Sequence, residues 1–258
     1  MGFFGKLFEK KVCDFCGGEI GLLGNRKLED GNMCKNCAGK LSPWFDDRRH
    51  STVEQISAQL EYREANKAAV AAFNTTRSLG VNTKILIDED ARKFMVTSAR
   101  NLAEANPDVL DFSQVTGVDL DIDEGQREEK RKDAEGNSVS YNPPRYTFYY
   151  DFHLIIRVNH PYFDDIRFRL NSSSVELNPD IAMPVMRKPN PRMNADYMEY
   201  HAMGMEIKEI LTAARQQVRD EAVAAAAPKT AVTCPWCGAT TLPDANGCCE
   251  YCGGSVNG

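Results

Sequence analysis

The segment that follows residue 50 has the apolar spacing of a helix. Ser51 to Glu54 forms a capping-box pattern, in which side chains satisfy the first free N–H groups of a helix. Apolar residues then recur three to five positions apart, at Val53, Ile56, Leu60, Ala65, Ala69 and Phe73. This stripe predicts a helix from about residue 52 to 73 that packs through one face.

From residue 83 the apolar period changes to two, which is the period of β-strands. The pattern predicts short strands at 84–87, 93–96, 109–112, 115–122, 146–158 and 166–170. The segment 123–144 between two of these strands is charged, lacks large apolar side chains and ends in Pro143 and Pro144. We expect it to be a long mobile hairpin loop.

A second helical stripe follows the strands. Residues 180–191 are interrupted by prolines and are expected to be irregular. Apolar residues then fall three or four apart at Tyr200, Met203, Ile207, Ile210, Leu211, Ala214 and Val218. Such a stripe predicts a C-terminal helix that covers one face of an open antiparallel sheet.

The cysteines are concentrated at the two ends of the chain. The 258 residues contain 9 cysteines, and none lies between Ala38 and Thr233. The terminal segments are too short to bury a sufficient apolar core, so they require a metal or disulfides. The first residues lack the apolar run and cleavage site of a secretory signal, which favours a cytoplasmic protein with metal-binding thiolates.

The first cysteine group has the spacing C-x2-C-x17-C-x2-C. Two closely spaced pairs of thiolates can hold one tetrahedral ion, and four thiolates leave no open position for water or substrate. The first pair is followed by glycines, the middle contains a hairpin turn signal at 29–32, and residues 38–41 favour a short helix. This order predicts a treble-clef finger with structural zinc held by Cys13, Cys16, Cys34 and Cys37.

The second group consists of two C-x2-C-G segments separated by eleven residues, which is typical of a zinc ribbon. The expected ligands are Cys234, Cys237, Cys249 and Cys252. Cys248 is an alternative to Cys249, although the two-residue spacing favours Cys249, and the spare thiol is either reactive or a plain loop residue. Iron would use the same ligands, but the short loop and the matching finger favour zinc, with two structural ions per chain.

The remaining polar residues do not form a catalytic pattern. His50, His153, His160 and His201 lie outside metalloprotease or nucleophile motifs, and each is read as structural or solvated. Asp119, Asp121 and Asp123 alternate on a predicted strand and would share one face, either as a cation site or as a solvated surface. We therefore expect a protein that is not an enzyme.

Charge and the N-terminal segment bear on possible partners. The formal net charge of -6 disfavours general attraction to nucleic acid or anionic membranes. The aromatic residues Phe3, Phe4 and Phe8 alternate with lysines and could give weak membrane contact. No stretch reaches the roughly 20 apolar residues of a membrane-spanning helix.

Two resemblances refine this picture. The spacing of the first group resembles GATA-type fingers and, more closely, the N-terminal fingers of uncharacterised bacterial proteins that carry a PH-like domain. The dense basic tail of GATA fingers is absent, because Asp46 and Asp47 interrupt Arg48 and Arg49. The strands at 85–96, the segment 111–118 and the C-terminal helix resemble a bacterial PH-like domain, although Asp88, Glu89 and Asp90 occupy a turn where lipid-binding PH domains carry basic residues.

Together these patterns predict an α+β protein, with an antiparallel PH-like barrel or sandwich capped by a C-terminal helix and flanked by two zinc modules. The expected parts are a leader (1–11), a treble-clef finger (12–50), a connecting helix (51–79), a PH-like domain (80–222), a linker (223–232) and a zinc ribbon (233–258). We expect a non-catalytic interaction or adaptor protein with a protein partner. The alternatives are a nucleic-acid-binding regulator and a peripheral membrane scaffold, and the sequence does not identify the partner or the oligomeric state.

Overall fold

The computed structural model describes residues 11–178, 188–226, 231–244 and 246–256. The chain divides into two compact units, Met1–Arg215 and Gln216–Gly258. The predicted leader (1–11), irregular segment (180–191) and linker (223–232) lie wholly or partly outside the described residues. Within the described part of the chain, no helix is long and apolar enough to cross a membrane.

The N-terminal part of the first unit consists of small hairpins and one short helix. Strands β1 (Lys11–Val12) and β2 (Glu19–Ile20) pair, as do β3 (Asn25–Lys27) and β4 (Asn32–Cys34), and α1 (Lys35–Ala38) follows directly. Its apolar cluster contains Ile20, Leu28, Met33 and Leu41 with two cysteines, and Ile56 of the next helix completes it. The finger therefore shares its core with that helix.

Helix α2 (Val53–Ala72) confirms the first predicted helix but begins with a different cap. The Thr52 hydroxyl accepts from the Gln55 N–H, and the Gln55 side chain accepts from the Thr52 N–H. The capping box therefore starts one residue later than predicted, because the Ser51 hydroxyl instead donates to the carbonyl of Asp47 in the preceding 3₁₀ turn, Asp47–His50.

The buried face of α2 also differs from the predicted stripe. The buried positions are Ile56, Gln59, Arg63, Asn66 and Val70, whereas Ala65 is exposed. The helix thus turns three polar side chains toward the protein interior, and each of them requires a partner there or in a ligand.

The first central sheet has the order β5-β6-β7-β8 and is antiparallel. Strands β6 (Lys84–Asp88) and β7 (Lys93–Thr97) confirm two predicted strands, and β8 (Leu110–Asp111) is shorter than predicted because Phe112–Gln114 forms a 3₁₀ turn. Strand β5 (Arg77–Gly80) and helix α3 (Leu102–Ala105) were not predicted. The acidic turn has a structural role, since Asp88 is buried and accepts from the N–H groups of Asn74 and Ala91.

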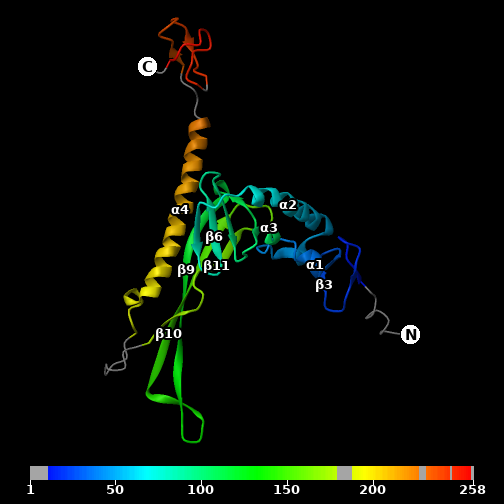
Figure 1. Ribbon diagram of the computed structural model, residues 1–258, viewed down its shortest axis with the longest axis vertical. Coiled ribbons are helices and arrows are strands. Elements are labelled where there is room, and N and C mark those ends of the chain that lie inside the picture. The colour runs from blue at the N-terminus through cyan, green and yellow to red at the C-terminus, as the bar shows by residue number, and fades with distance from the viewer. Residues whose placement is uncertain (1–10, 179–187, 227–230, 245, 257–258) are drawn as a thin grey trace, which may run out of the picture. The chain divides into compact units, whose positions relative to one another are not determined.

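The second sheet is built around one long hairpin, β9 (Val115–Lys132) and β10 (Ser138–Val158), shown in green in Figure 1. Strands β11 (Asp165–Arg169) and β12 (Val175–Leu177) pair with the other edge of β10. The prediction of a loop at 123–144 was wrong, because the ladder continues to Ser138 and Lys132 with one register shift between Ser140 and Arg145. Backbone hydrogen bonds and polar cross-strand pairs, rather than burial, sustain these strands.

Helix α4 (Ala195–Ala226) is longer than the predicted C-terminal helix. Its predicted stripe faces inward, with Ile207 and Leu211 fully buried, and Tyr197 packs edge-on against Tyr150 and Phe152 of β10. The helix therefore covers the apolar face of the second sheet. Of the predicted barrel or sandwich, no closed barrel is formed: the two central sheets remain separate in the described residues. The predicted α+β class with antiparallel sheets and a C-terminal helix is confirmed.

The second unit begins within α4. After the helix, its described residues form one small antiparallel pair, β13 (Val232–Thr233) with β14 (Thr240–Thr241), and a single bridge between Cys248 and Ser255. Because this segment has so little regular structure, we expect its folding to depend on the cysteine group.

Candidate metal centres

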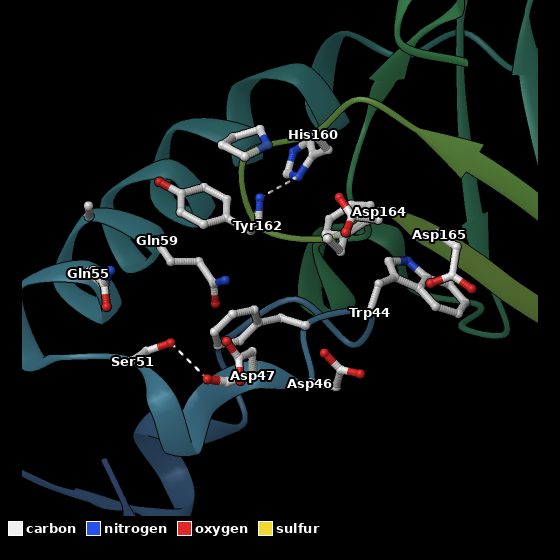
Figure 2. A pocket seen from close by; sticks show the side chains of 14 residues that line it. Trp44, Asp46, Asp47, Ser51, Gln55, Gln59, His160, Tyr162, Asp164 and Asp165 are labelled. Atoms are coloured by element: carbon white, nitrogen blue, oxygen red, sulfur yellow. Dashed lines mark hydrogen bonds between the residues drawn. The ribbon is translucent and has the colours of Figure 1, made fainter. Parts of the chain in front are cut away.

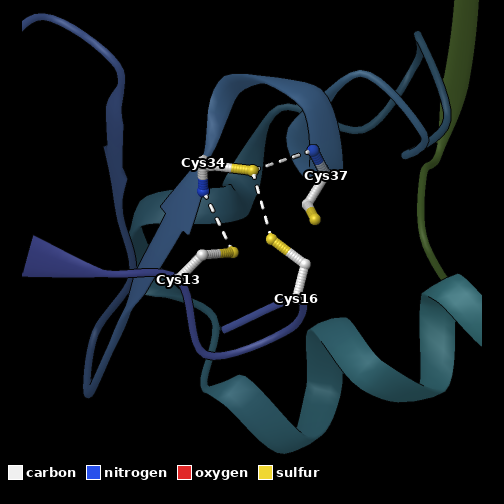
Figure 3. Close-up of side chains that lie close together, drawn as sticks. All are labelled: Cys13, Cys16, Cys34 and Cys37. Carbon is white, nitrogen blue, oxygen red and sulfur yellow. Dashed lines mark hydrogen bonds between the residues drawn. The ribbon is translucent and has the colours of Figure 1, made fainter. Parts of the chain in front are cut away.

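The structure brings the four N-terminal cysteines together from two separate local elements (Figure 3). Cys13 and Cys16 lie in the turn between β1 and β2, whereas Cys34 ends β4 and Cys37 lies in α1. Their sulfur atoms all lie within 4.8 Å of one another, and Cys16 Sγ is 3.8 Å from Cys34 Sγ. The backbone N–H groups of Cys34 and Cys37 point at the sulfurs of Cys13 and Cys34, at 3.3 and 3.4 Å.

The C-terminal cysteines form a second group of the same kind. The sulfurs of Cys234, Cys237, Cys249 and Cys252 also lie within 4.8 Å of one another, with separations of 3.6 Å for Cys234–Cys252 and 3.7 Å for Cys237–Cys249. Cys248 lies outside the group, and its thiol is 3.9 Å from the carbonyl oxygen of Asn246. The structure thus places Cys249 rather than Cys248 beside the other three sulfurs.

Three of the four C-x2-C turns share one backbone geometry. In the turn that begins at Cys13, the Cys13 N–H donates to Gly18 and the Gly17 N–H donates back to Cys13, both at 2.9 Å. The turns that begin at Cys234 and Cys249 repeat this pair of bonds. In each turn the glycine has a left-handed backbone, with φ of +68° at Gly17, +72° at Gly238 and +70° at Gly253. The C-x2-C-G pattern therefore encodes the turn that aims both sulfurs to the same side.

The sulfur separations fit a metal and not disulfides. A tetrahedral ion with Zn–S bonds of about 2.3 Å holds its sulfurs about 3.8 Å apart, whereas a disulfide joins two sulfurs at about 2.05 Å. The separations of 3.6–3.8 Å between the sulfurs match the first value, and all nine cysteines are unbridged. Each group of four can bind one metal ion, consistent with zinc.

Electrostatics at the first group favour a divalent cation. Burial opposes ionisation of Cys13, but N–H groups of Cys34, Phe15 and Cys16 outweigh it and hold the pKa of the Cys13 thiol at about 6. Burial and the neighbouring cysteine sulfurs raise the pKa of the Cys37 thiol to about 12. Four thiolates cannot coexist at this spacing without a cation, and a metal ion takes the place of the remaining protons.

The second group also contains one thiol with a lowered pKa and one with a raised pKa. Despite desolvation, N–H groups of Cys252 and Tyr251 lower the pKa of the Cys249 thiol to about 6. At Cys252, the N–H of Gly254 favours the thiolate, but the sulfurs of Cys237 and Cys234 outweigh it and raise the pKa to about 12. Both groups therefore combine one easily ionised thiol with one that ionises only when a cation is present.

The alternating aspartates of β9 have protein partners. Asp119 pairs with Arg157 at 2.5 Å and with Lys208 of α4 at 3.7 Å, while Asp121 pairs with Arg167 at 3.0 Å. Asp123 lies 3.1 Å from His153 and 3.5 Å from Arg167. Because basic side chains compensate these carboxylates, this face is a polar surface of the sheet and not a metal site.

The four histidines have separate surroundings. His50 pairs with Asp47 at 2.6 Å, and His201 stacks on Tyr197. His153 lies beside Asp123, but its Nδ1 lacks a well-aligned hydrogen bond. His160 is buried, its Nδ1 accepts from the Tyr162 N–H, and its Nε2 is 3.0 Å from the Tyr62 hydroxyl. They do not converge on one centre.

A buried polar junction joins the finger, α2 and the segment before β8, and it was not predicted from the sequence. Arg63 donates to Asp108 at 2.6 Å and also to the carbonyls of Asn106 and Lys40. The second carboxylate oxygen of Asp108 accepts from the Ser42 hydroxyl at 2.8 Å. Only 6% of the Arg63 side chain and 0% of the Asp108 side chain are exposed, so this is a fully desolvated ion pair.

Asparagine side chains complete the junction. Asn66 donates to Asn106 Oδ1 and to the Pro107 carbonyl, both at 2.8 Å, and accepts from the Val109 N–H at 3.1 Å. Asn106 in turn donates to the Arg63 carbonyl at 2.7 Å. Because each of these polar groups has a partner, the junction fixes the orientation of α2 against the first central sheet.

The finger lies close to the start of α2 at Gly31. A Cβ atom on Gly31 would lie 2.4 Å from Val53 Cγ2 and 2.7 Å from the Asp14 carboxylate, which accepts from the Asn32 N–H at 2.6 Å. We expect Gly31→Ala to lower the free energy of unfolding by about 1–3 kcal/mol through overpacking, measured by urea denaturation. Gly21→Ala is the matched control, since nothing lies within 4 Å of its added Cβ. Equal stability of the two variants would contradict this close contact.

Comparison with known proteins gives one match. The sequence profile of a domain of unknown function, DUF4428, matches residues 11–59. This stretch contains the first cysteine group and the part of α2 that completes its core. Comparison with curated proteins and with solved structures gives no match.

Proposed function

We propose that this chain is a non-catalytic zinc-binding interaction protein that acts in the cytoplasm and presents surfaces to a protein partner. The observation that carries the proposal is the pair of four-sulfur groups with separations of 3.6–3.8 Å. Four protein ligands fill the coordination sphere of a tetrahedral zinc ion and leave no position for water or substrate, so each ion would have a structural role.

In this proposal the N-terminal module is a treble-clef finger and the C-terminal module is a zinc ribbon. One C-x2-C turn, two hairpins and α1 support the first assignment, and two identical C-x2-C-G turns support the second. For the central part we propose a PH-like domain with an open sheet arrangement, supported by the order of two antiparallel sheets followed by α4. The fold of such a domain does not determine its function, which resides in the surface that it presents.

Metal analysis and affinity capture test this function together. Freshly reduced chain is expected to contain two zinc ions, and the immobilised zinc-loaded chain is expected to retain a protein partner in high salt. The Cys248→Ser variant is the control, because Cys248 lies outside both sulfur groups and the variant should keep both ions and the partner. A metal-free chain, or retained nucleic acid that is released steeply as salt rises, would overturn the proposal.

A further inference from the structure

A cleft of about 510 Å³ lies between the start of α2 and the turn that joins β10 to β11 (Figure 2). One wall comes from residues 44–47 and the first half of α2, and the other comes from residues 160–165. The volume falls within the range of about 300–1,000 Å³ that is usual for ligand sites. The cleft is separate from both cysteine groups, because none of its lining residues is a cysteine.

The side chain of Gln59 gives the first indication of a ligand. Gln59 is 0% exposed, and both its amide oxygen and its amide nitrogen lack a hydrogen-bond partner. Figure 2 shows its side chain extending from α2 into the cleft, between Tyr162 and the segment that carries Asp46 and Asp47. A buried amide without partners is costly, and a molecule that offers both a donor and an acceptor would satisfy it.

The charge of the lining favours a cation. The lining contains four carboxylates and neither lysine nor arginine: Asp46, Asp47, Asp164 and Asp165. Asp47 pairs with His50, whereas no ion pair is formed by the other three among the residues that the structure describes. His160 adds no positive charge, because burial lowers its pKa and both ring nitrogens are engaged by Tyr162 and Tyr62.

The carboxylates do not converge as they would around a metal ion. In the described part of the chain, only the two cysteine groups bring three or more potential ligand atoms within 4.8 Å of one another. The cation must therefore be extended enough to reach several carboxylates. Partly exposed rings of Trp44 and Tyr162 line the same cleft and offer faces on which a flat cation stacks.

We propose that this cleft binds an arginine residue of a peptide. The guanidinium group is flat, stacks on aromatic rings and carries five N–H donors for the carboxylates, whereas a lysine ammonium is a compact point charge. The peptide backbone beside it supplies the N–H and carbonyl that the Gln59 amide lacks. This assignment rests on the proposed interaction role and names the chemistry of its partner.

Fluorescence of Trp44 provides the test, in zinc-loaded full-length chain carrying Trp236→Phe, since Trp236 is the second of 2 tryptophans. The probes are the blocked peptide acetyl-Gly-Arg-Gly-amide, its citrulline counterpart and N-acetylarginine. The arginine peptide is expected to change Trp44 emission saturably, and the citrulline peptide, which has the same shape without the charge, should bind at least about tenfold more weakly.

Two variants and one control locate the binding. Gln59→Met removes the amide at nearly constant volume, and Asp165→Asn removes one exposed charge, so each should weaken arginine-peptide binding about fivefold to tenfold while the circular dichroism stays unchanged. Asp90→Asn changes an exposed carboxylate outside the cleft and should leave binding within about twofold.

Three results would overturn the assignment: no saturable change with the arginine peptide, equal binding of the citrulline peptide, or unchanged affinity in both cleft variants. If N-acetylarginine binds as tightly as the peptide, the ligand is a small guanidinium compound and not an arginine residue of a peptide. If the chain binds two zinc ions and captures a protein partner equally well in Gln59→Met and Asp165→Asn, the interaction role stands and the cleft assignment fails.

Discussion

Replacing Cys13 with serine is expected to reduce the zinc content from two ions to one per chain and to unfold the N-terminal finger. Cys13 is 1% exposed, and its sulfur lies within 4.8 Å of the other three sulfurs of its group. Structural zinc contributes about 10–16 kcal/mol in isolated finger peptides, which is as large as the whole free energy of unfolding of a typical protein, about 5–15 kcal/mol. The few apolar residues of the finger core cannot replace that contribution.

Metal analysis and amide hydrogen exchange measure this effect. Amides in residues 13–41 should lose protection in Cys13→Ser, whereas those of β10 and the first half of α4 should keep most of theirs. Cys248→Ser is again the matched control, because it removes a thiol that is not part of either group. Two zinc ions in Cys13→Ser, or undiminished protection in its finger, would refute the role of this sulfur.

Replacing Asp108 with alanine is expected to lower the free energy of unfolding by about 3–5 kcal/mol, because Arg63 would remain as an uncompensated buried charge. The substitution also removes the acceptor of the Ser42 hydroxyl. Urea denaturation measures the change. Exchanging both partners, in Arg63→Met with Asp108→Leu, should recover a large part of the loss, since apolar groups do not need charge compensation.

Arg77→Ala is the control, because it also breaks an ion pair, but one that is exposed to solvent. Arg77 pairs with Glu89 at 3.3 Å, but the two side chains are 41% and 47% exposed. Exposed pairs of this kind contribute only about 0–1 kcal/mol. If Asp108→Ala lowered the free energy of unfolding by no more than Arg77→Ala does, the junction would not hold α2 in place.

The cysteine groups could be predicted from spacing alone, because a C-x2-C-G segment determines its own turn through local hydrogen bonds. The glycine that follows three of the four pairs and adopts the left-handed backbone is visible in the sequence, and so is the two-residue spacing that favours Cys249 over Cys248. The apolar stripe of α4 and the strands β6 and β7 were likewise predicted, since their periodicity reflects burial on one face.

The paired ends of β9 and β10 were not predicted, because these parts of the strands are not stabilised by burial of an apolar face. Their residues are mostly polar, and they pair through backbone hydrogen bonds and contacts such as Thr147 with Glu129 at 2.8 Å. The turn between them was the available signal: the Asp133 side chain accepts from the N–H groups of Glu135 and Asn137, as aspartate commonly does in tight turns.

The polar face of α2 could not be predicted from periodicity. A helical stripe of glutamine, arginine and asparagine normally indicates solvent, and here it is buried because Asn106 and Asp108 approach from a distant part of the sequence. The cleft was missed for the same reason, since its two walls come from residues 44–59 and 160–165. Contacts between such distant segments leave no local pattern.

The double attachment of α2 has a consequence for recognition. One part of the helix belongs to the finger core through Ile56, and another is anchored to the segment before β8 through Arg63 and Asn66. The N-terminal finger is therefore not a flexible arm that closes over its target. The α2 wall of the cleft beside Gln59 is therefore already held in place by contacts at both ends of the helix. We expect this wall to lose little conformational entropy when a molecule binds there.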